Sequence, residues 1–291
     1  MKFVQITDTH IVPPGEKLYD LDTRERLEAC IADINANHRD AELCIITGDL
    51  ANHGQLAAYE NLKQALIYLE LPYHLLIGNH DHRDNFKKVF NDVPCDENGF
   101  VQSVLDTAAG CFILLDSVEH GERWGSFCEQ RAAWLRTQLD KARQAPVYLF
   151  IHHPPFEIGI PSLDYIRLRD PSYLREAVKQ HRNIKHLFLG HVHRPISGSW
   201  FGVPYSMLRS TSHQVCFDFE VVNPVPKSHE PPAYAVVLLN DDTVVVHLHD
   251  YLNRSNLPLP DDTERMSGSR RDELPLSFAL HARASDTQAT R

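Results

Sequence analysis

Five short apolar segments of the chain are each followed at once by side chains that can bind a metal ion. Those side chains are Asp8 and His10, Asp49, Asn79, His152, and His191 with His193. Carboxylate, amide oxygen and neutral imidazole together suit divalent first-row metals, and a set without cysteine disfavours a structural zinc site. The set is larger than one tetrahedral ion needs and suits two ions.

The order of these residues along the chain predicts that they meet in space. If the apolar segments are strands, the ligands follow their carboxyl ends, where open α/β sheets bind ligands. Asp8 and His10 are two residues apart, as are His191 and His193, and this spacing would point both members of a pair the same way. Glycine precedes Asp49, Asn79 and His191 and suits a tight turn with close backbone approach. Singly, each residue could be a turn or capping residue, but five similar strand ends favour a metal centre.

Periodicity indicates the elements that must position these ligands. Strands are expected at 3–6, 43–46, 73–77, 100–105, 111–115, 147–151, 184–189, 203–208, 215–221, 234–239 and 244–248. Helices are expected at 22–38, 55–70, 129–142 and 172–180. Strand, helix, strand at this rhythm predicts βαβ units and a largely parallel start to the sheet. We expect two facing sheets with helices on their outer faces.

The length and the change in composition near the C-terminus predict one large domain and a tail. We expect the domain at residues 1–252, in which the β-rich stretch 203–250 could form a cap or a subunit interface. From Asn253 onward the chain is rich in proline, serine, aspartate and arginine. Such a composition favours a polar C-terminal tail at 253–291 over a further domain.

Composition excludes several classes of protein. With 43% hydrophobic and 23% charged residues, the chain fits no collagen-like, coiled-coil or wholly disordered class. No apolar run approaches the roughly 18 residues of a membrane span, and the N-terminus lacks a signal peptide's long apolar region. The six cysteines form no C-x-x-C pair, so we expect reduced thiols in a cytoplasmic protein. The net charge of −10 argues against a nucleic-acid backbone as the main partner.

Taken in order, the five groups of ligands resemble the five blocks of the calcineurin-like metallophosphoesterases. The blocks are Asp8-x-His10, Gly48-Asp49, Gly78-Asn79-His80-Asp81, His152-x-Pro154 and Gly190-His191-x-His193. As a set they are highly specific, whereas any one alone is weak. The resemblance implies an α/β fold, a four-layer α/β/β/α sandwich of two mixed β-sheets, and a phosphoester hydrolase with two metal ions.

Further segments are similar to the bacterial glycerophosphodiesterases and class III cyclic nucleotide phosphodiesterases. They are Gly15-Glu16-Lys17-Leu18-Tyr19, Leu71-Pro72-Tyr73 before the third block, the His-His-Pro-Pro form of the fourth block, and Ser212-His213-Gln214. Phosphoprotein phosphatases carry Asp-Arg-Gly after the second block, and the segment from Leu50 to Gly54 lacks it. This similarity implies a phosphoric diester hydrolase for glycerophosphodiesters or cyclic nucleotides.

Matched block by block, the resemblance implies a ligand set for each metal. The first would be held by Asp8, His10, Asp49 and His193, and the second by Asp49, Asn79, His152 and His191. Two divalent ions less two aspartates leave a local charge of roughly +2, which would attract a phosphodiester, and metal activation lowers the pKa of water toward about 7 for in-line attack. His80 is the first candidate to protonate the leaving alkoxide and His213 the second, although His213 could be a surface histidine. His153 is expected to point to the other side.

Other hypotheses stay open at this point. Iron, manganese, zinc and cobalt all suit the ligand set. A phosphomonoesterase or nuclease could use the same fold, although the acidic charge and the lack of a basic run speak against a nuclease. A non-catalytic, metal-stabilised scaffold is the alternative from another class, and it would have no use for His80. As partners we expect a small phosphodiester substrate, no membrane, and further copies of the chain, because members of the family are often dimers or larger.

Overall fold

The strands of the chain form two large mixed sheets. The computed structural model describes residues 1–253, so the tail expected at 253–291 lies almost entirely outside the described residues. The first sheet has the order β13-β12-β1-β2-β3. Its strands are β1 (Lys2–Ile6), β2 (Cys44–Thr47), β3 (Tyr73–Leu76), β12 (Tyr234–Leu239) and β13 (Val244–His249). Strands β1, β2 and β3 are parallel, as predicted, and β12 pairs antiparallel with β1.

The second sheet has the order β4-β5-β6-β7-β9-β8. Its strands are β4 (Ser103–Thr107), β5 (Gly110–Leu115), β6 (Val147–Ile151), β7 (Ile184–Leu189), β8 (Ile196–Trp200) and β9 (Val203–Met207). Strands β5, β6, β7 and β9 are parallel, with β4 and β8 antiparallel at the two edges. A separate two-stranded ribbon pairs β10 (Gln214–Val215) with β11 (Lys227–Ser228).

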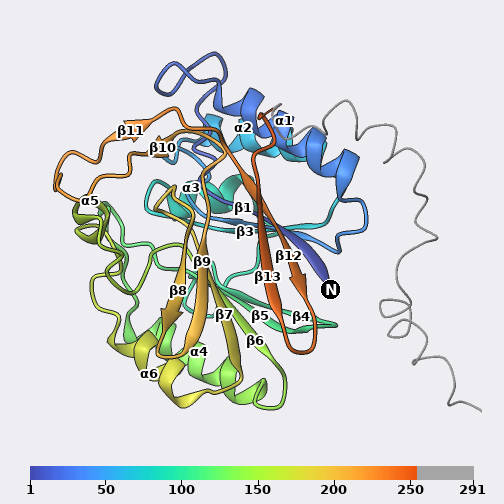
Figure 1. Cartoon of the computed structure of the whole chain (residues 1–291), viewed down its shortest axis with the longest axis vertical. Helices are drawn as coiled ribbons and strands as arrows, with labels where there is room; N and C mark the ends of the chain where they lie inside the picture. The colour runs from blue at the N-terminus through green and yellow to red at the C-terminus, as the bar shows by residue number, and fades with distance from the viewer. Residues whose placement is uncertain (254–291) are drawn as a thin grey trace, which may run out of the picture. The chain divides into compact units, whose positions relative to one another are not determined.

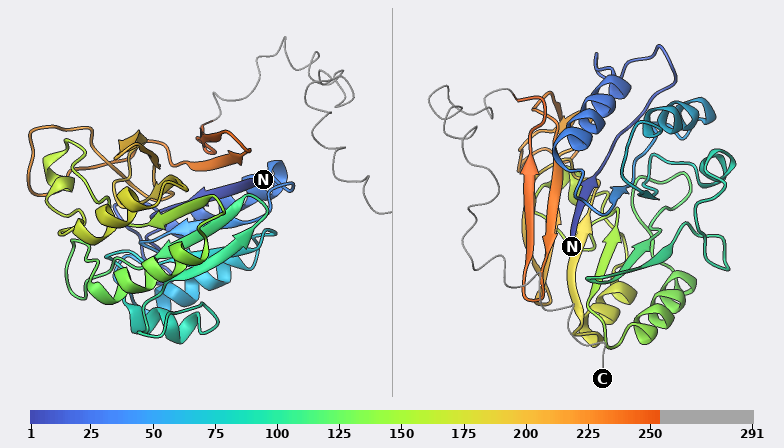
Figure 2. Two further views of the ribbon diagram at one scale, coloured as in Figure 1. Left: turned by 90° about the horizontal axis from the view of Figure 1, so that it is seen from below. Right: turned by 90° about the vertical axis from the view of Figure 1, so that its right-hand side faces the viewer.

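Helices cover the outer face of each sheet, as Figures 1 and 2 show. Helices α1 (Thr23–Asn37), α2 (Leu56–Leu66) and α3 (Arg83–Val89) pack on the first sheet, and α4 (Glu129–Lys141) and α6 (Ser172–Gln180) pack on the second. The short helix α5 (Pro161–Asp164) lies in the segment between β6 and α6. The fold is therefore the expected α/β/β/α sandwich. None of the helices within residues 1–253 is long and apolar enough to cross a membrane.

The alternation of side chains along each strand divides the core into three layers. On β1, Val4 and Ile6 face helices α1 and α2, whereas Phe3 faces the second sheet. The Phe3 ring makes edge contacts with Phe112 and Phe188 across the gap, both at 5.3 Å between ring centroids. Burial on both faces explains why the central strands are continuous apolar runs in the sequence. This packing fixes the two sheets, and with them the loops at their carboxyl ends.

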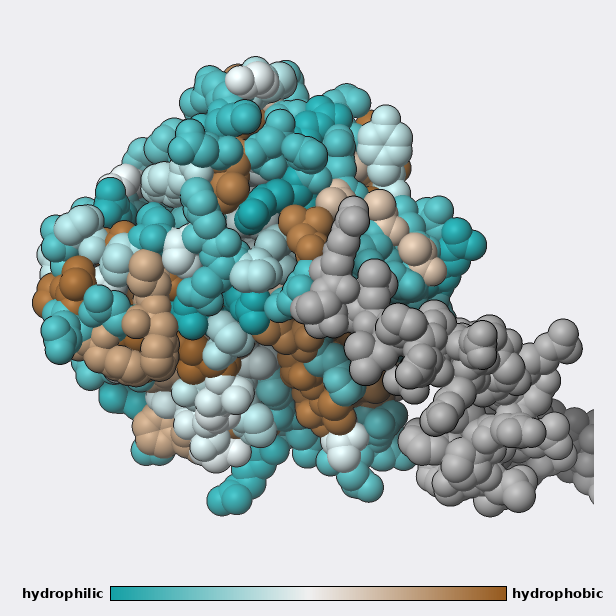
Figure 3. Space-filling model, turned by 45° about the horizontal axis from the view of Figure 1, so that its top comes forward, coloured by the Kyte–Doolittle hydropathy of each residue, from teal (hydrophilic) through white to brown (hydrophobic). Residues whose placement is uncertain are grey.

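The largest departure from the predicted elements lies at residues 215–221. The alternation of apolar and polar residues there predicted a strand, but only Gln214 and Val215 pair with β11. The Asp218 carboxylate accepts hydrogen bonds from the backbone N–H groups of Glu220 and Val221, at 2.8 and 2.9 Å. Such a side-chain turn competes with strand pairing, so the prediction was wrong beyond Val215. Phe217 and Phe219 of this segment are exposed, and apolar side chains gather on the left of the surface in Figure 3.

Candidate metal centre

The loops that follow five parallel strands meet where the carboxyl ends of the two sheets adjoin. Asp8 and His10 follow β1, Asp49 follows β2, Asn79 follows β3, His152 follows β6, and His191 and His193 follow β7. A hydrogen bond from the backbone N–H of His191 to the Asp8 carboxylate, at 3.1 Å, joins a loop of one sheet to a loop of the other. The sandwich therefore brings the predicted ligands together, as the sequence pattern required.

One group of ligand atoms is formed by the residues expected around the first metal. Single ligand atoms of Asp8, His10, Asp49 and His193 all lie within 4.8 Å of one another, and all four side chains are buried. The Nε2 atoms of His10 and His193 are 3.1 Å apart. Oδ2 of Asp49 is 3.6 Å from Nε2 of His10, and Oδ1 of Asp8 is 3.4 Å from Nε2 of His193. This group has the size and composition of a first-row metal site.

A second group lies on the other side of Asp49. Nε2 of His152 is 3.3 Å from Oδ2 of Asp49, so the same carboxylate faces both groups. The ring of His191 lies 5.2 Å from that of His152 between centroids. Nε2 of His152, both ring nitrogens of His191 and Oδ1 of Asn79 are buried without a hydrogen-bond partner among the described residues. Buried polar atoms in proteins are nearly always paired, so this set fits a metal ion that would satisfy them.

Hydrogen bonds fix which nitrogen of each histidine carries the proton. Nδ1 of His152 lies 2.7 Å from the carbonyl oxygen of Thr47, and Nδ1 of His193 lies 2.7 Å from that of His213. A carbonyl oxygen only accepts, so both Nδ1 atoms must donate and both Nε2 atoms present lone pairs. Nδ1 of His10 likewise faces the amide oxygen of Asn52 at 3.2 Å. The Nε2 lone pairs of His10 and His193 thus face each other and that of His152 faces the Asp49 carboxylate, an arrangement that a cation stabilises.

The electrostatics of the centre favour positive charge beside Asp49. Burial by itself would raise the pKa of Asp49, but the neighbouring His152, His80 and His10 outweigh it and hold that pKa well below its usual range. Burial lowers the pKa of His152, yet the carboxylates of Asp49 and Asp8 outweigh burial and raise it to about 9. Without a metal ion, a proton is therefore drawn to the lone pair that faces Asp49. A metal ion at that position would replace the proton.

The backbone of the ligand loops is unusual in a way that the sequence did not reveal. Positive φ angles occur at Asp8 (54°), His10 (43°), Asp49 (49°), His191 (71°) and His193 (51°). This left-handed region is sparsely populated by residues other than glycine and costs about 1–3 kcal/mol each where the surroundings impose it. The members of each Asp-x-His or His-x-His pair therefore converge through left-handed turns, rather than through the strand alternation that we expected. Such strain is typical of functional sites.

His153 lies beside the second group, contrary to the expectation that it points to the other side. Its ring is 4.7 Å from that of His191 between centroids, and His152, His153 and His191 each offer a ligand atom within 4.8 Å of the others. The alternation rule failed because β6 ends at Ile151, before both histidines. Nδ1 of His153 lies 2.8 Å from the hydroxyl of Ser117, which fixes the ring.

The two candidate proton donors both line the cavity above the centre. Nδ1 of His80 lies 2.7 Å from the carbonyl oxygen of Asn52 and must donate to it, which leaves Nε2 for a substrate. His213 is buried rather than on the surface, and its ring lies 4.6 Å from that of His193 between centroids. Burial, followed by the neighbouring His193, lowers the pKa of His213. The surface-histidine alternative for His213 was therefore wrong.

Several supporting residues escaped the sequence analysis. Asn52 orients His10 with its side chain and His80 with its carbonyl oxygen. The Asp81 carboxylate accepts hydrogen bonds at 2.9–3.0 Å from the backbone N–H groups of Leu50, Ala51 and Gly78, which joins the second and third ligand loops. The sequence alone marks the segment Leu50–Gly54 only by the Asp-Arg-Gly motif that it lacks, and it gives Asp81 no role.

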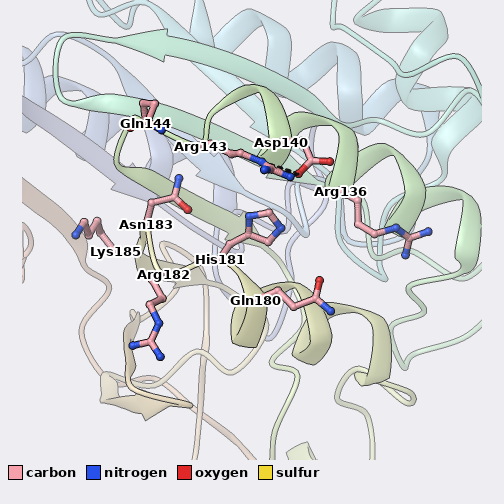
Figure 4. Close-up of a pocket in the computed structure, with 9 residues that line it drawn as sticks. All are labelled: Arg136, Asp140, Arg143, Gln144, Gln180, His181, Arg182, Asn183 and Lys185. Carbon is pink, nitrogen blue, oxygen red and sulfur yellow. Dashed lines mark hydrogen bonds and ion pairs between the residues drawn. The ribbon is translucent and has the colours of Figure 1, made fainter.

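The cavity above the centre has a volume of about 330 Å³ and mixed walls. Polar ligands form its floor, and the other lining residues include Tyr19, Arg123, Leu163, Ile166, Val215, Pro224, Val225 and Lys227. A larger hollow of about 860 Å³ lies at the amino ends of β6 and β7, opposite to the ends that carry the ligands (Figure 4). That hollow contains no metal-ligand group, and its Arg143 is already paired with Asp140 at 2.7 Å. The smaller cavity is therefore the candidate site.

Comparisons with known proteins agree with this geometry. A family model described as calcineurin-like phosphoesterase matches residues 1–195. The chain is 44% identical over 250 residues to a "probable cyclic nucleotide phosphodiesterase" of Rhodopseudomonas palustris, an alignment that covers 85% of this chain and 91% of that protein. It is 31% identical over 263 residues to a "probable glycerophosphodiester phosphodiesterase" of Arcobacter nitrofigilis, covering 89% and 96%. A dimetal phosphatase from Danio rerio has a similar fold, with a TM-score of 0.67, 14% identity and coverage of 87% and 96%.

Proposed function

The chain belongs to the calcineurin-like phosphoesterase family and is a phosphodiester hydrolase, and from this premise we propose that it hydrolyses small phosphodiesters, cyclic nucleotides or glycerophosphodiesters, at a centre of two metal ions. The observation that carries the two-metal proposal is the position of Asp49. Its carboxylate faces His10 on one side and His152 on the other, at 3.6 and 3.3 Å. One carboxylate between two groups of imidazole lone pairs is the arrangement that bridges two cations.

The residues around Asp49 would divide between the two ions. Asp8, His10, Asp49 and His193 would hold the first ion, and Asp49, Asn79, His152 and His191 would hold the second. When bound, the pair supplies Lewis acidity to the phosphoryl oxygens and a hydroxide nucleophile near neutral pH. Fe, Mn, Zn and Co all suit this mixture of carboxylate, amide and imidazole ligands.

The chain's own side chains have the remaining tasks of the reaction. The alkoxide that leaves an alkyl or ribose diester needs a proton, and His80 is held with Nε2 toward the cavity by its bond to Asn52. We assign His80 as the general acid, with His213 as the second candidate because its ring adjoins His10 and His193. The apolar wall at Leu163, Ile166 and Val215 would exclude water from the organic part of the substrate.

Two features favour this proposal over its alternatives. The chain covers nearly the whole length of two relatives whose names give diesters as substrates, which favours a phosphodiesterase over a phosphomonoesterase or nuclease. A metal-stabilised scaffold would have no use for an accessible cavity over the ligands or for His80 at its edge. We also propose a cytoplasmic location, supported by six cysteines that are all free, and a homo-oligomer, for which the exposed apolar residues Phe217, Phe219 and Val222 offer an interface.

A comparison of a diester with a monoester tests the proposal. Purified protein is assayed on bis-p-nitrophenyl phosphate and on p-nitrophenyl phosphate, with and without added Mn²⁺. We expect Mn²⁺-dependent hydrolysis in which the diester is the better substrate by kcat/KM. A preference for the monoester would replace phosphodiesterase by phosphomonoesterase, and no hydrolysis of either would favour the scaffold. Cyclic AMP and glycerophosphoethanolamine then separate the two diester classes.

A further inference from the structure

Two positive side chains line the cavity above the metal centre without an anionic partner. Arg123 lies in the segment between β5 and α4, and Lys227 lies on β11. Both side chains are exposed, and within residues 1–253 neither the Arg123 guanidinium nor the Lys227 ammonium has a hydrogen bond or an ion pair. Two cationic side chains from segments far apart in the sequence thus line one cavity without an anionic partner.

The neighbouring arginines behave differently. Arg194 is paired with Glu230 at 2.6 Å, and Arg83 is paired with Asp116 at 2.8 Å. The chain has 39 acidic and 29 basic residues, so anionic partners are in excess. What distinguishes Arg123 and Lys227 is their place, because both line the cavity that also contains the predicted metal ligands.

The strand pairing places Lys227 beside Val215, two residues after His213, whose ring adjoins those of His10 and His193. Partial burial, followed by the charge of Arg123, lowers the pKa of Lys227, in agreement with two cations that line one cavity. Two like charges held close together favour an anion between them.

The scissile phosphate does not account for this pair. A phosphodiester carries one negative charge, and the metal ions held around Asp8 and Asp49 would already face it with positive charge. Arg123 and Lys227 add two further positive charges to the wall of the cavity, where the rest of the substrate would lie. We propose that Arg123 and Lys227 form a subsite for a second anionic group, a carboxylate or a phosphate, on the part of the diester that does not react.

This inference rests on the proposed phosphodiesterase function and narrows its substrate class. Glycerophosphoserine differs from glycerophosphoethanolamine by one carboxylate, so the pair isolates the effect of that group. The p-nitrophenyl ester of thymidine 5′-phosphate, with and without a 3′-phosphate, isolates the effect of a second phosphate. A charged hydrogen bond to the extra anion should raise kcat/KM by about 10- to 100-fold. We expect this preference in at least one of the two pairs.

A double variant, Arg123→Gln with Lys227→Gln, assigns that preference to the subsite. We expect the ratio of kcat/KM between the two members of the preferred pair to fall to about one. The control, Arg182→Gln with Lys185→Gln, removes the same charge from exposed residues of the remote hollow (Figure 4) and should leave the ratio unchanged. Thermal unfolding of both variants verifies that they are folded.

The outcomes separate this inference from the proposed function. If the wild-type protein hydrolyses both members of each pair equally well, the second-anion subsite is wrong and the phosphodiesterase stands. If the double variant loses activity equally on both members of a pair, the cations act on the scissile phosphate and the inference is overturned. Absence of hydrolysis of every diester in the presence of Mn²⁺ would overturn the proposed function and the inference together.

Discussion

Replacing Gly78 by alanine should damage the centre without altering a single ligand. A Cβ atom on Gly78 would lie 2.6 Å from the backbone nitrogen of Asp49 and 2.6 Å from Nε2 of His152, and closer still to Oδ1 of Asp49. Ordinary contacts begin at 3.4 Å, so these atoms must move apart by roughly 0.8 Å. The φ angle of Gly78 lies outside the left-handed region, so the damage comes from this contact and not from backbone strain.

The size of the effect follows from the atoms that must move. The crowded atoms belong to the carboxylate that faces both ligand groups and to a histidine of the second group. A misplacement of about 1 Å in a catalytic arrangement can cost about 10²-fold in rate. We therefore expect Gly78→Ala to lose about 100-fold or more in kcat on bis-p-nitrophenyl phosphate, together with weaker binding of the second metal.

Gly202→Ala is the matched control for the same substitution. Gly202 lies in the turn between β8 and β9, and its Cβ would meet no atom within 4 Å, but its φ of +83° strains alanine. That strain costs about 1–2 kcal/mol of stability and should leave kcat unchanged. Turnover and metal content within about twofold of wild type in Gly78→Ala would refute the position that we give to Asp49 at the centre.

Three further predictions concern single side chains. Asn79→Ala should weaken binding of the second metal ion much more than binding of the first, because one neutral ligand is lost while Asp49 remains. Activity should recover at high Mn²⁺ concentration. An equal loss of affinity at both sites in a metal titration would contradict this. His80→Ala should keep its metals and lose about 10²–10⁴-fold on glycerophosphoethanolamine but much less on bis-p-nitrophenyl phosphate, whose leaving group needs no proton; equal losses would reject the general-acid role. Burial lowers the pKa of His186 to about 4. Between pH 6.5 and pH 4 the unfolded chain therefore binds a proton at His186 that the folded chain does not bind. The free energy of unfolding should fall by about 3 kcal/mol as the pH falls through that range. The free energy of unfolding is measured with urea in the presence of EDTA for wild type and His186→Gln. Between pH 7 and pH 4, His186→Gln should lose about 3 kcal/mol less of this free energy than wild type. The same loss in both proteins would show that His186 does not cause the pH dependence.

The sequence predicted the parts of the fold that depend on burial. Strand β6 is buried along its whole length and strand β7 is buried except at Lys185, and their predicted bounds agree with the structure to the residue. Elements held by little apolar surface were missed. Strand β8 has the sequence Ile-Ser-Gly-Ser-Trp at an exposed edge, and the seven-residue helix α3 buries only Phe86. At residues 215–221 a local turn at Asp218 prevailed over an alternation that favours a strand.

The same distinction applies to the site. The ligands were predictable because each of their side chains offers one kind of atom to a metal and follows a recognisable strand. The residues that orient them were not, since Asn52 acts through its carbonyl oxygen as much as through its side chain. Lys227 lies far along the chain from every ligand, and only the pairing of β10 with β11 carries it to the cavity. Long-range placement of this kind leaves no local pattern in one sequence.

A stoichiometric metal titration tests most directly whether two ions bridged by Asp49 are responsible for catalysis. Metal-free protein is titrated with Mn²⁺ while bound metal and hydrolysis of bis-p-nitrophenyl phosphate are measured on the same samples, with Asp49→Ala beside the wild type. We predict that wild-type activity rises until two ions are bound per chain, and that Asp49→Ala stays inactive at any Mn²⁺ concentration. Full activity with one ion per chain, or near-normal turnover by Asp49→Ala, would contradict the two-metal centre.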